Sequence, residues 1–349
     1  MNLPIYPWQT SAWSALRGLQ DQGRLPHAIL LHGPPGIGKM ALAEHFARAL
    51  LCQSPLADGQ GCGQCASCAW FAGYNHPDYR RVRPEALEAA DAQGGDADGA
   101  ADTEERKAAK STRAPSREIK VEQIRALTEL MALSTHRQGR RVVLLYPAQA
   151  MNAIAANALL KTLEEPPADT VFLLIADGLE RLLPTILSRC RKFALPTPDT
   201  VPALAWLREQ GVADAPSWLA RAGGSPLAAL AQAQTRDEAF PKLLAYLAEP
   251  NTLAALKTAE LLQKHPPATL VDWMQRWLHD MLSCKMTGVI RYLPGQREAI
   301  AALASRADTV QLLHLARATG RRRVIAEHPL SARLFIEDML LDYANLFPG

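Results

Sequence analysis

The first half of the chain alternates short apolar runs with segments of helical periodicity. Three largely apolar runs bounded by turn residues lie at residues 28–31, 141–146 and 171–176, and the more polar residues 78–83 are a further candidate strand. Runs of this kind are typical of strands buried on both faces, as in a parallel sheet. The pattern therefore predicts an α/β fold, in which helices flank a parallel sheet.

A helix is expected directly after the first run, at residues 39–51, because apolar residues recur there at spacings of four, three and one. Four residues share its apolar face: Leu42, Phe46, Ala49 and Leu50. Residues 148–165 predict a second long helix with buried Ile154, Leu159 and Leu163. Further helices are expected at residues 119–133, from about residue 180, and at residues 185–191.

From Leu195 onward the periodicity is helical only. The sequence PTPDT at residues 196–200 is typical of a linker, and GGSP at residues 223–226 separates two short helices. Helical segments are expected at residues 201–209, 217–221, 226–233, 239–247, 252–264, 270–282, 297–306, 310–317 and 331–346. The C-terminal third therefore predicts a helical bundle, with Trp273, Trp277 and Leu278 in its core.

Residues 85–117 differ in composition from the rest of the chain. They are rich in Ala, Gly, Asp and Lys and nearly devoid of large apolar residues, which predicts a solvated, disordered insertion. The whole chain of 349 residues is long enough for two or three domains, and its net charge of +3 does not demand nucleic acid. There is no apolar stretch of membrane-spanning length and no signal-peptide pattern, so we expect a cytoplasmic protein.

The stretch AILLHGPPGIGKM at residues 28–40 has the order strand, glycine-rich loop and helix that a P-loop requires. Its backbone N–H groups would surround phosphate oxygens at the positive end of the helix. The residues expected to form this cradle are Gly33, Gly36, Gly38 and Lys39. A glycine-rich turn without a ligand is the alternative.

Two features predict that this phosphate cradle does not support hydrolysis. Met40 stands where a Ser or Thr hydroxyl should hold Mg²⁺, and a thioether is a poor ligand for a hard cation. The run at residues 141–146 ends in Tyr146-Pro147, where P-loop ATPases usually carry an acidic pair. We therefore expect that ATP or ADP is bound weakly, if at all, and is not hydrolysed.

Four of the six cysteines lie within seventeen residues, with the spacing C-x9-C-x2-C-x2-C. They are Cys52, Cys62, Cys65 and Cys68. Thiolates at such spacing share a tetrahedral Zn²⁺ in knuckle-like sites, and an iron–sulfur ferredoxin pattern is absent. Free buried thiols are the alternative. The cluster predicts a structural zinc module.

Several motifs occur in one order: the P-loop, the cysteine cluster, HPDY at residues 76–79, NALLKTLEEPP at residues 157–167 and LSRC at residues 187–190. In this order they resemble the bacterial clamp-loader family of AAA+ proteins. The resemblance implies three domains: an AAA+ P-loop-like module at residues 1–195, a helical lid at residues 196–236 and a helical collar for oligomerisation at residues 237–349.

Departures from the family pattern distinguish the subunit type. The motor subunits, gamma and tau, carry a polar sensor near Ala176 and a lid arginine where this chain has Pro226-Leu227. Together with Met40 and Tyr146-Pro147, these changes imply a subunit without ATPase activity. Arg189 of the LSRC motif is retained, and the resemblance implies that it reaches the neighbouring subunit's ATP site as an arginine finger. A structural ion pair at a helix end is the alternative for Arg189.

The resemblance also implies partners. The chain would join motor subunits and the delta subunit in a hetero-oligomeric ring, which loads the sliding clamp onto primed DNA as part of the DNA polymerase III holoenzyme. Two other functions are weighed against this one. An active motor-type ATPase would need an unrecognised acid such as Asp177, and a zinc-knuckle module could bind nucleic acid. In the NALLKTLEEPP segment, Lys161, Glu164 and Glu165 form either a solvated face or a partner contact.

Overall fold

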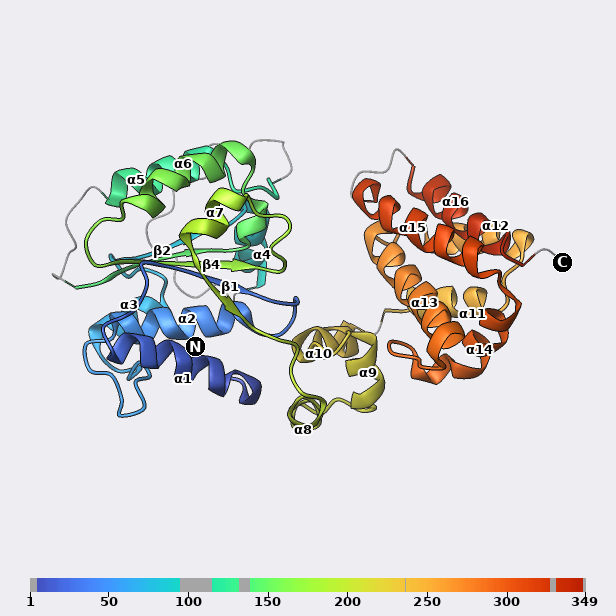
Figure 1. Cartoon of the computed structure of the whole chain (residues 1–349), viewed down its shortest axis with the longest axis horizontal. Coiled ribbons are helices and arrows are strands. Elements are labelled where there is room, and N and C mark those ends of the chain that lie inside the picture. Colours follow the sequence, from blue (N-terminus) through green and yellow to red (C-terminus); the bar gives the residue numbers. More distant parts are fainter. Residues whose placement is uncertain (1–4, 95–114, 132–138, 236, 327–330, 348–349) are drawn as a thin grey trace. The chain divides into compact units, whose positions relative to one another are not determined.

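A five-stranded parallel sheet lies at the centre of the N-terminal half (Figure 1). Along the chain the strands are β1 Ala28–His32, β2 Tyr79–Val82, β3 Arg141–Leu145, β4 Thr170–Ala176 and β5 Arg191–Ala194. Across the sheet their order is β2-β3-β4-β1-β5. The computed structural model describes residues 5–94, 115–131, 139–235, 237–326 and 331–347. It divides into two compact units, Met1–Pro198 and Asp199–Gly349.

Helices cover both faces of the sheet because successive strand residues point to opposite sides. Ile29 and Leu31 of β1 pack on the face covered by α1 (Thr10–Asp21), α2 (Lys39–Leu51) and α3 (Ala66–Ala72). Leu30 packs on the other face, under α5 (Val121–Met131), α6 (Ala153–Glu164) and α7 (Pro184–Arg189). Figure 1 shows these two helical layers, and the arrangement confirms the predicted α/β fold.

The second unit is entirely helical in its described part. Its helices are α8 (Thr200–Glu209), α9 (Ala215–Arg221), α10 (Pro226–Thr235), α11 (Ala239–Ala248), α12 (Thr252–Leu262), α13 (Pro267–Thr287), α14 (Arg297–Arg306), α15 (Thr309–Ile325) and α16 (Ala332–Ala344). Helices α8 to α10 share one apolar cluster, and α11 to α16 share a larger one. Among the described residues no helix is both long and apolar enough to cross a membrane.

Buried aromatic residues organise the larger helical cluster. Trp273, Trp277 and Leu278 all lie in its core, as the periodicity predicts. The Trp277 Nε1–H donates to the Tyr343 hydroxyl over 2.8 Å, and that hydroxyl donates to the Leu247 carbonyl over 2.8 Å. These bonds satisfy the polar atoms of the buried rings, so large apolar surfaces are buried without an unpaired donor.

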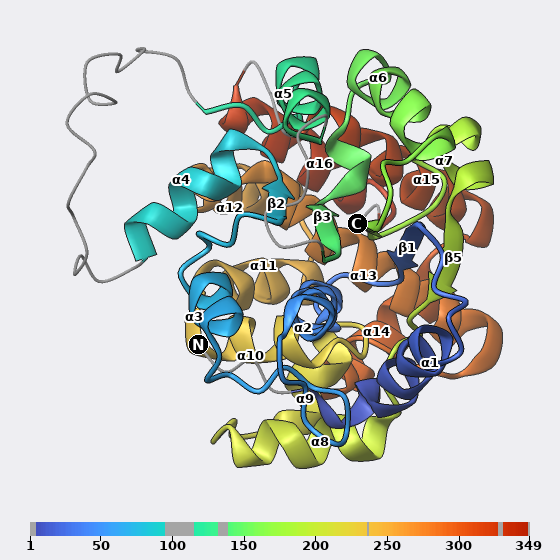
Figure 2. The same ribbon diagram turned by 90° about the vertical axis from the view of Figure 1, so that its left-hand side faces the viewer.

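The structure corrects five local predictions. The segment at residues 85–117 does not begin as a disordered insertion, because α4 (Glu85–Gly94) follows β2 at the sheet edge (Figure 2). Residues 95–114 lie outside the described residues. The predicted helix at residues 148–165 is divided into a 3-10 turn, Ala148–Ala150, and α6, because the Asn152 side chain caps α6 by accepting from the Ala155 N–H.

The other three corrections concern Ile154 and the two helices expected between residue 180 and residue 191. Ile154, expected in the core, is 66% exposed because it lies in the first turn of α6 on the solvent side. No helix begins near residue 180, and the helix expected at residues 185–191 ends at Arg189. The chain then forms the edge strand β5, whose residues RKFA are mostly exposed and carry no apolar run that periodicity could detect.

Candidate functional site

The predicted P-loop connects β1 to α2 at the carboxyl end of the central strands. Gly36 and Gly38 have positive φ values of 76° and 87°, which favour glycine, and Gly38 precedes the first turn of α2. A Cβ at Gly33 would collide with the carbonyl oxygen of Leu195. The three glycines of the predicted cradle are therefore required by the backbone itself, whether or not an anion binds there.

Lys39 turns back into this loop and is almost completely buried. Its Nζ donates to the carbonyl oxygens of Gly33 (2.7 Å) and Pro34 (2.6 Å), and to Oδ1 of Asp177 (2.8 Å). An ammonium group has three donors, and all three are engaged within the protein. A phosphate at this loop would have to displace at least one of these acceptors.

Asp177 follows β4 and has partners for both of its carboxylate oxygens. Oδ1 pairs with Lys39, and Oδ2 accepts from Nε2 of Gln149 over 3.0 Å. The Asp177 N–H donates in turn to Oε1 of Gln149 over 3.3 Å. Sequence reasoning weighed Asp177 only as a substitute acid and missed Gln149. The sequence carries a signal for Asp177, because a polar residue directly after a parallel strand lies at the same sheet edge as the P-loop, but Gln149 follows its strand only after several residues.

The N-terminal segment packs against the same loop. The Trp8 Nε1–H donates to the Ile37 carbonyl over 2.9 Å, and Nε2 of the buried Gln9 donates to the carbonyls of Ile37 (3.1 Å) and Gly38 (2.8 Å). A Cβ at Gly38 would come within 2.8 Å of the Tyr6 ring. The loop is thus held from one side by Tyr6, Trp8 and Gln9, and from the other by Asp177.

Neither residue at the expected metal positions offers a ligand for Mg²⁺. Met40 and Tyr146 are both partly buried and pack against the apolar cluster on the α2 face of the sheet. Burial, together with the nearby charge of Asp177, raises the pKa of the Tyr146 hydroxyl, so this group stays protonated at neutral pH. Asp177 is the carboxylate that lies beside the P-loop lysine, and its oxygens are already paired.

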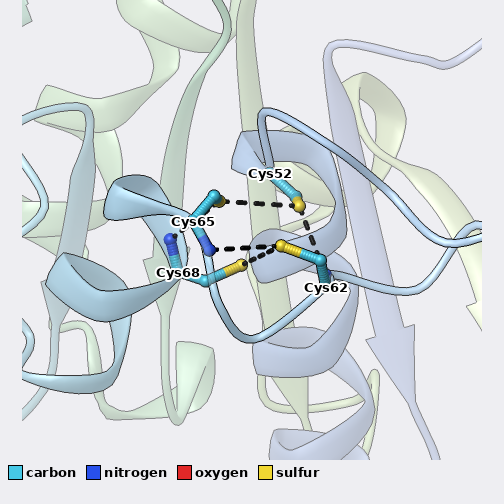
Figure 3. A group of neighbouring side chains, drawn as sticks. All are labelled: Cys52, Cys62, Cys65 and Cys68. Carbon is cyan, nitrogen blue, oxygen red and sulfur yellow. Dashed lines mark hydrogen bonds between the residues drawn. The ribbon is translucent and has the colours of Figure 1, made fainter.

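The four predicted cysteines converge between the end of α2 and the start of α3 (Figure 3). Their sulfur atoms all lie within 4.8 Å of one another, with Cys52 and Cys65 separated by 3.9 Å and Cys62 and Cys68 by 4.0 Å. Four thiolates at about 2.3 Å from one tetrahedral ion are separated by roughly 3.8 Å. The arrangement therefore fits a Zn²⁺ ion held by all four residues.

Backbone N–H groups point at these sulfurs and favour the thiolate form. The sulfur of Cys62 accepts from the Cys65 N–H over 3.3 Å, and that of Cys65 accepts from the Cys68 N–H over 3.4 Å. Burial raises the pKa of the Cys65 thiol, but these and neighbouring hydrogen bonds outweigh it and lower the pKa to about 6. Burial raises the pKa of Cys68 to about 12, so a bound cation would be needed to ionise all four thiols.

Arg189 lies at the C-terminal end of α7, between residues that anchor this helix in the core. Ile186 and Cys190 are buried in the cluster under α6, whereas the Arg189 side chain is 30% exposed. Its Nε donates to Oε1 of Glu164 over 2.7 Å, and its Nη2 forms an ion pair with the same oxygen. Its Nη1 donates to the Thr185 carbonyl (2.9 Å) and to Oγ of Ser188 (3.2 Å).

This geometry contains the ion pair that was the alternative interpretation of Arg189. Glu164 is exposed and Arg189 is partly exposed, and pairs near the surface typically contribute about 0–1 kcal/mol to stability. A pair this weak can be exchanged for another anion. Sequence reasoning identified Arg189 but missed Glu164 as its partner, since the two residues are 25 positions apart.

Two family models match the chain. The model described as "DNA polymerase III, delta subunit" matches residues 8–199, and the model described as "DNA polymerase III, delta subunit, C terminal" matches residues 231–344. Among solved structures, a DNA polymerase III gamma subunit-related protein of Thermotoga maritima has 18% identity and a TM-score of 0.45, over 95% of this chain and 99% of that one.

Curated relatives agree with the family models. The DNA polymerase III subunit delta' of Pseudomonas aeruginosa is 37% identical, over 99% of this chain and 98% of that protein. The DNA polymerase III subunit delta' of Escherichia coli K12 is 34% identical, over 79% of this chain and 76% of that protein. With matches of this length across both units, the chain belongs to the family of DNA polymerase III delta' subunits.

Proposed function

We propose that this chain is a non-catalytic subunit of the DNA polymerase III clamp loader. In this proposal it hydrolyses no ATP itself and completes the ATP site of a neighbouring motor subunit with Arg189. The observation that carries the proposal is the contrast between the two cationic side chains expected to meet phosphate, Lys39 and Arg189. Lys39 is buried and fully engaged by acceptors of its own loop and by Asp177, whereas Arg189 is partly exposed and held by an exchangeable ion pair.

The closed P-loop supports the non-catalytic part of the proposal. Binding of ATP would require Lys39 to give up protein acceptors, and a bound Mg²⁺ would find a thioether and a phenol where hydroxyl and carboxylate ligands belong. Both changes weaken phosphate and metal binding at the same site. We therefore expect any nucleotide bound here to be bound weakly and left intact.

The partly exposed Arg189 supports the proposal that this chain completes a neighbouring subunit's ATP site. A guanidinium placed against the transferred phosphoryl group offsets the charge that develops there, and an arginine supplied by a neighbouring protein can raise the rate by 10³–10⁵-fold. Arg189 lies on the surface of the first unit at the end of a short helix, where a neighbouring subunit can reach it.

The other parts of the chain take supporting roles in this proposal. The zinc module stiffens the connection between α2 and α3, and the helices of the C-terminal third bind sister subunits in a ring. The partners are the gamma or tau motor subunits and the delta subunit. The assembled complex, in the cytoplasm, places the sliding clamp on primed DNA.

Reconstitution tests the proposed function directly. The isolated chain is expected to show no ATP turnover above background. Adding it to gamma and delta subunits with clamp and primed DNA is expected to raise turnover and clamp loading together. Turnover by the chain alone at a rate like that of the motor subunits would refute the proposal.

One observation favours a second candidate, an active motor-type ATPase. Asp177 lies beside the P-loop lysine at the end of β4, where a carboxylate can contact a nucleotide-bound metal. If the isolated chain turns over ATP, Asp177→Asn should abolish that turnover. If the chain is inert, this candidate is excluded.

A further inference from the structure

Glu164 holds Arg189 by the edge of the guanidinium that a phosphate would use. A guanidinium offers two edges for bidentate binding of an oxyanion, Nε with Nη2 and Nη1 with Nη2. Glu164 occupies Nε and Nη2 through one oxygen, while Nη1 donates to Thr185 and Ser188. Both edges are therefore engaged before any ligand arrives, and Glu164 is the charged acceptor among the three partners.

The position of Glu164 makes this hold reversible. Glu164 is the last residue of α6, and a carboxylate at a helix C-terminus is unfavourable because it adds to the negative end of the helix dipole. Pairing with Arg189 offsets that charge. The Glu164 side chain is exposed and that of Arg189 is partly exposed, so water and salt compete with the pair, and a polyanion such as a nucleotide phosphate competes more strongly.

We infer that Glu164 is a latch on Arg189, and that Arg189 engages the phosphate of a neighbouring subunit's nucleotide by exchanging Glu164 for it. The restraint of Arg189 by Glu164 does not depend on the proposed function, whereas the exchange of Glu164 for a neighbouring subunit's phosphate rests on it. On release, the Nε–Nη2 edge becomes available while Thr185 and Ser188 retain Nη1. The guanidinium thus keeps an anchored side and presents its other side to the phosphate.

The latch reduces the fraction of Arg189 that is ready to bind, and it therefore weakens the apparent affinity of the shared site for ATP. Exposed ion pairs correspond to at most about a fivefold effect on an equilibrium. In the reconstituted complex, Glu164→Gln is expected to lower the KM for ATP about two- to fivefold. Glu165→Gln is the matched control, because Glu165 is the neighbouring exposed acid, and it is expected to leave KM unchanged.

A measurement on the free chain separates the latch from the proposed function. Arginine side chains react with phenylglyoxal, and mass spectrometry of the peptides reports the rate at Arg189. Glu164→Gln is expected to raise that rate at least about twofold, and Glu165→Gln is expected to leave it at the wild-type value. Equal rates in all three proteins would show that Glu164 does not restrain Arg189.

The two measurements give distinguishable failures. A KM that is unchanged or higher in Glu164→Gln would overturn the latch, because Glu164 would then be neutral or would hold Arg189 in its productive pose. If Arg189→Ala leaves turnover of the complex unchanged, the proposed function fails. The phenylglyoxal rates would still decide whether Glu164 restrains Arg189 in the free chain.

Discussion

Lys39 and Asp177 link two segments that are 138 residues apart, and their ion pair closes the P-loop. The ammonium group is buried and the carboxylate is 37% exposed, so the lysine depends on this partner more than the aspartate does. Breaking such a pair from one side leaves a buried charge without its counterion. The pair therefore stabilises the loop in the closed form that supports the non-catalytic proposal.

Asp177→Asn is expected to lower the free energy of unfolding by about 1–2 kcal/mol, because Lys39 keeps its carbonyl acceptors but loses its counterion. Urea unfolding at neutral pH measures this change. Glu180→Gln is a suitable control because Glu180 is exposed in the same loop, and its effect should stay within about 0.5 kcal/mol. Equal stabilities of the two variants would show that the ion pair is not what holds the loop.

Short-range patterns and long-range pairs differ in how well sequence predicts them. The P-loop residues from Gly33 to Lys39 and the four cysteines each lie within a few residues of one another, so spacing alone brings them together. The partners Gln149–Asp177 and Glu164–Arg189 are 28 and 25 residues apart and meet only because α6, α7 and the strands pack as they do. No pattern along the chain encodes those contacts.

The four-cysteine segment connects two helices through a loop that has little apolar packing of its own. Residues 53–60 are largely exposed, and Cys68 and Phe71 anchor α3 in the core. A metal ion held by four thiolates would then supply much of the free energy that orders this segment, since structural zinc contributes directly to folding.

Removal of the metal is expected to unfold this module before the rest of the chain. Cys65→Ser should abolish stoichiometric zinc and increase hydrogen exchange of the amides at residues 52–72. Cys284→Ser is the matched control, because Cys284 lies in α13 of the second unit. The measurements are metal content by mass spectrometry and hydrogen exchange. A zinc-free wild-type protein with a protected module would contradict the assignment.

Strands and helices that carry an apolar pattern are predicted well, and those that lack one are not. The bounds of α2 agree with the prediction, whereas β5 was missed because an exposed edge strand needs no apolar residues. α4 was missed because its Ala-rich sequence resembles a solvated segment in composition. Its first turn is held by contacts to Ser116 and Lys120, which lie more than 30 residues away.

The residues that follow the undescribed segment 95–114 contact the first turn of α4. The Ala86 N–H donates to the Ser116 carbonyl over 3.0 Å, and Lys120 pairs with Glu85 at 2.7 Å. Loop length between such fixed points has little effect on stability, because closure entropy changes only slowly with length.

Replacing residues 95–114 with a Gly/Ser linker of about eight residues should shift the melting temperature by less than about 3 °C, which corresponds to under 1 kcal/mol. Such a linker can span the roughly 15 Å length of α4 and return to residue 115. Differential scanning calorimetry measures the shift. A larger loss would show that these residues stabilise the fold.

The proposed role belongs to the molecule as part of an assembly, in which its own P-loop is closed and Arg189 completes the ATP site of a neighbouring subunit. The most direct test is ATP turnover by gamma subunits reconstituted with the delta subunit, clamp, primed DNA and this chain, as wild type or Arg189→Ala. Arg191→Ala is the matched control, because Arg191 is an exposed arginine two residues away on β5. Gel filtration confirms that each complex assembles.

We predict that Arg189→Ala lowers turnover at the shared site by at least about tenfold, since a finger arginine contributes several orders of magnitude in rate. Arg191→Ala should leave turnover unchanged, and both complexes should assemble like the wild type. Wild-type turnover in an intact complex that carries Arg189→Ala would show that Arg189 does not act as an arginine finger.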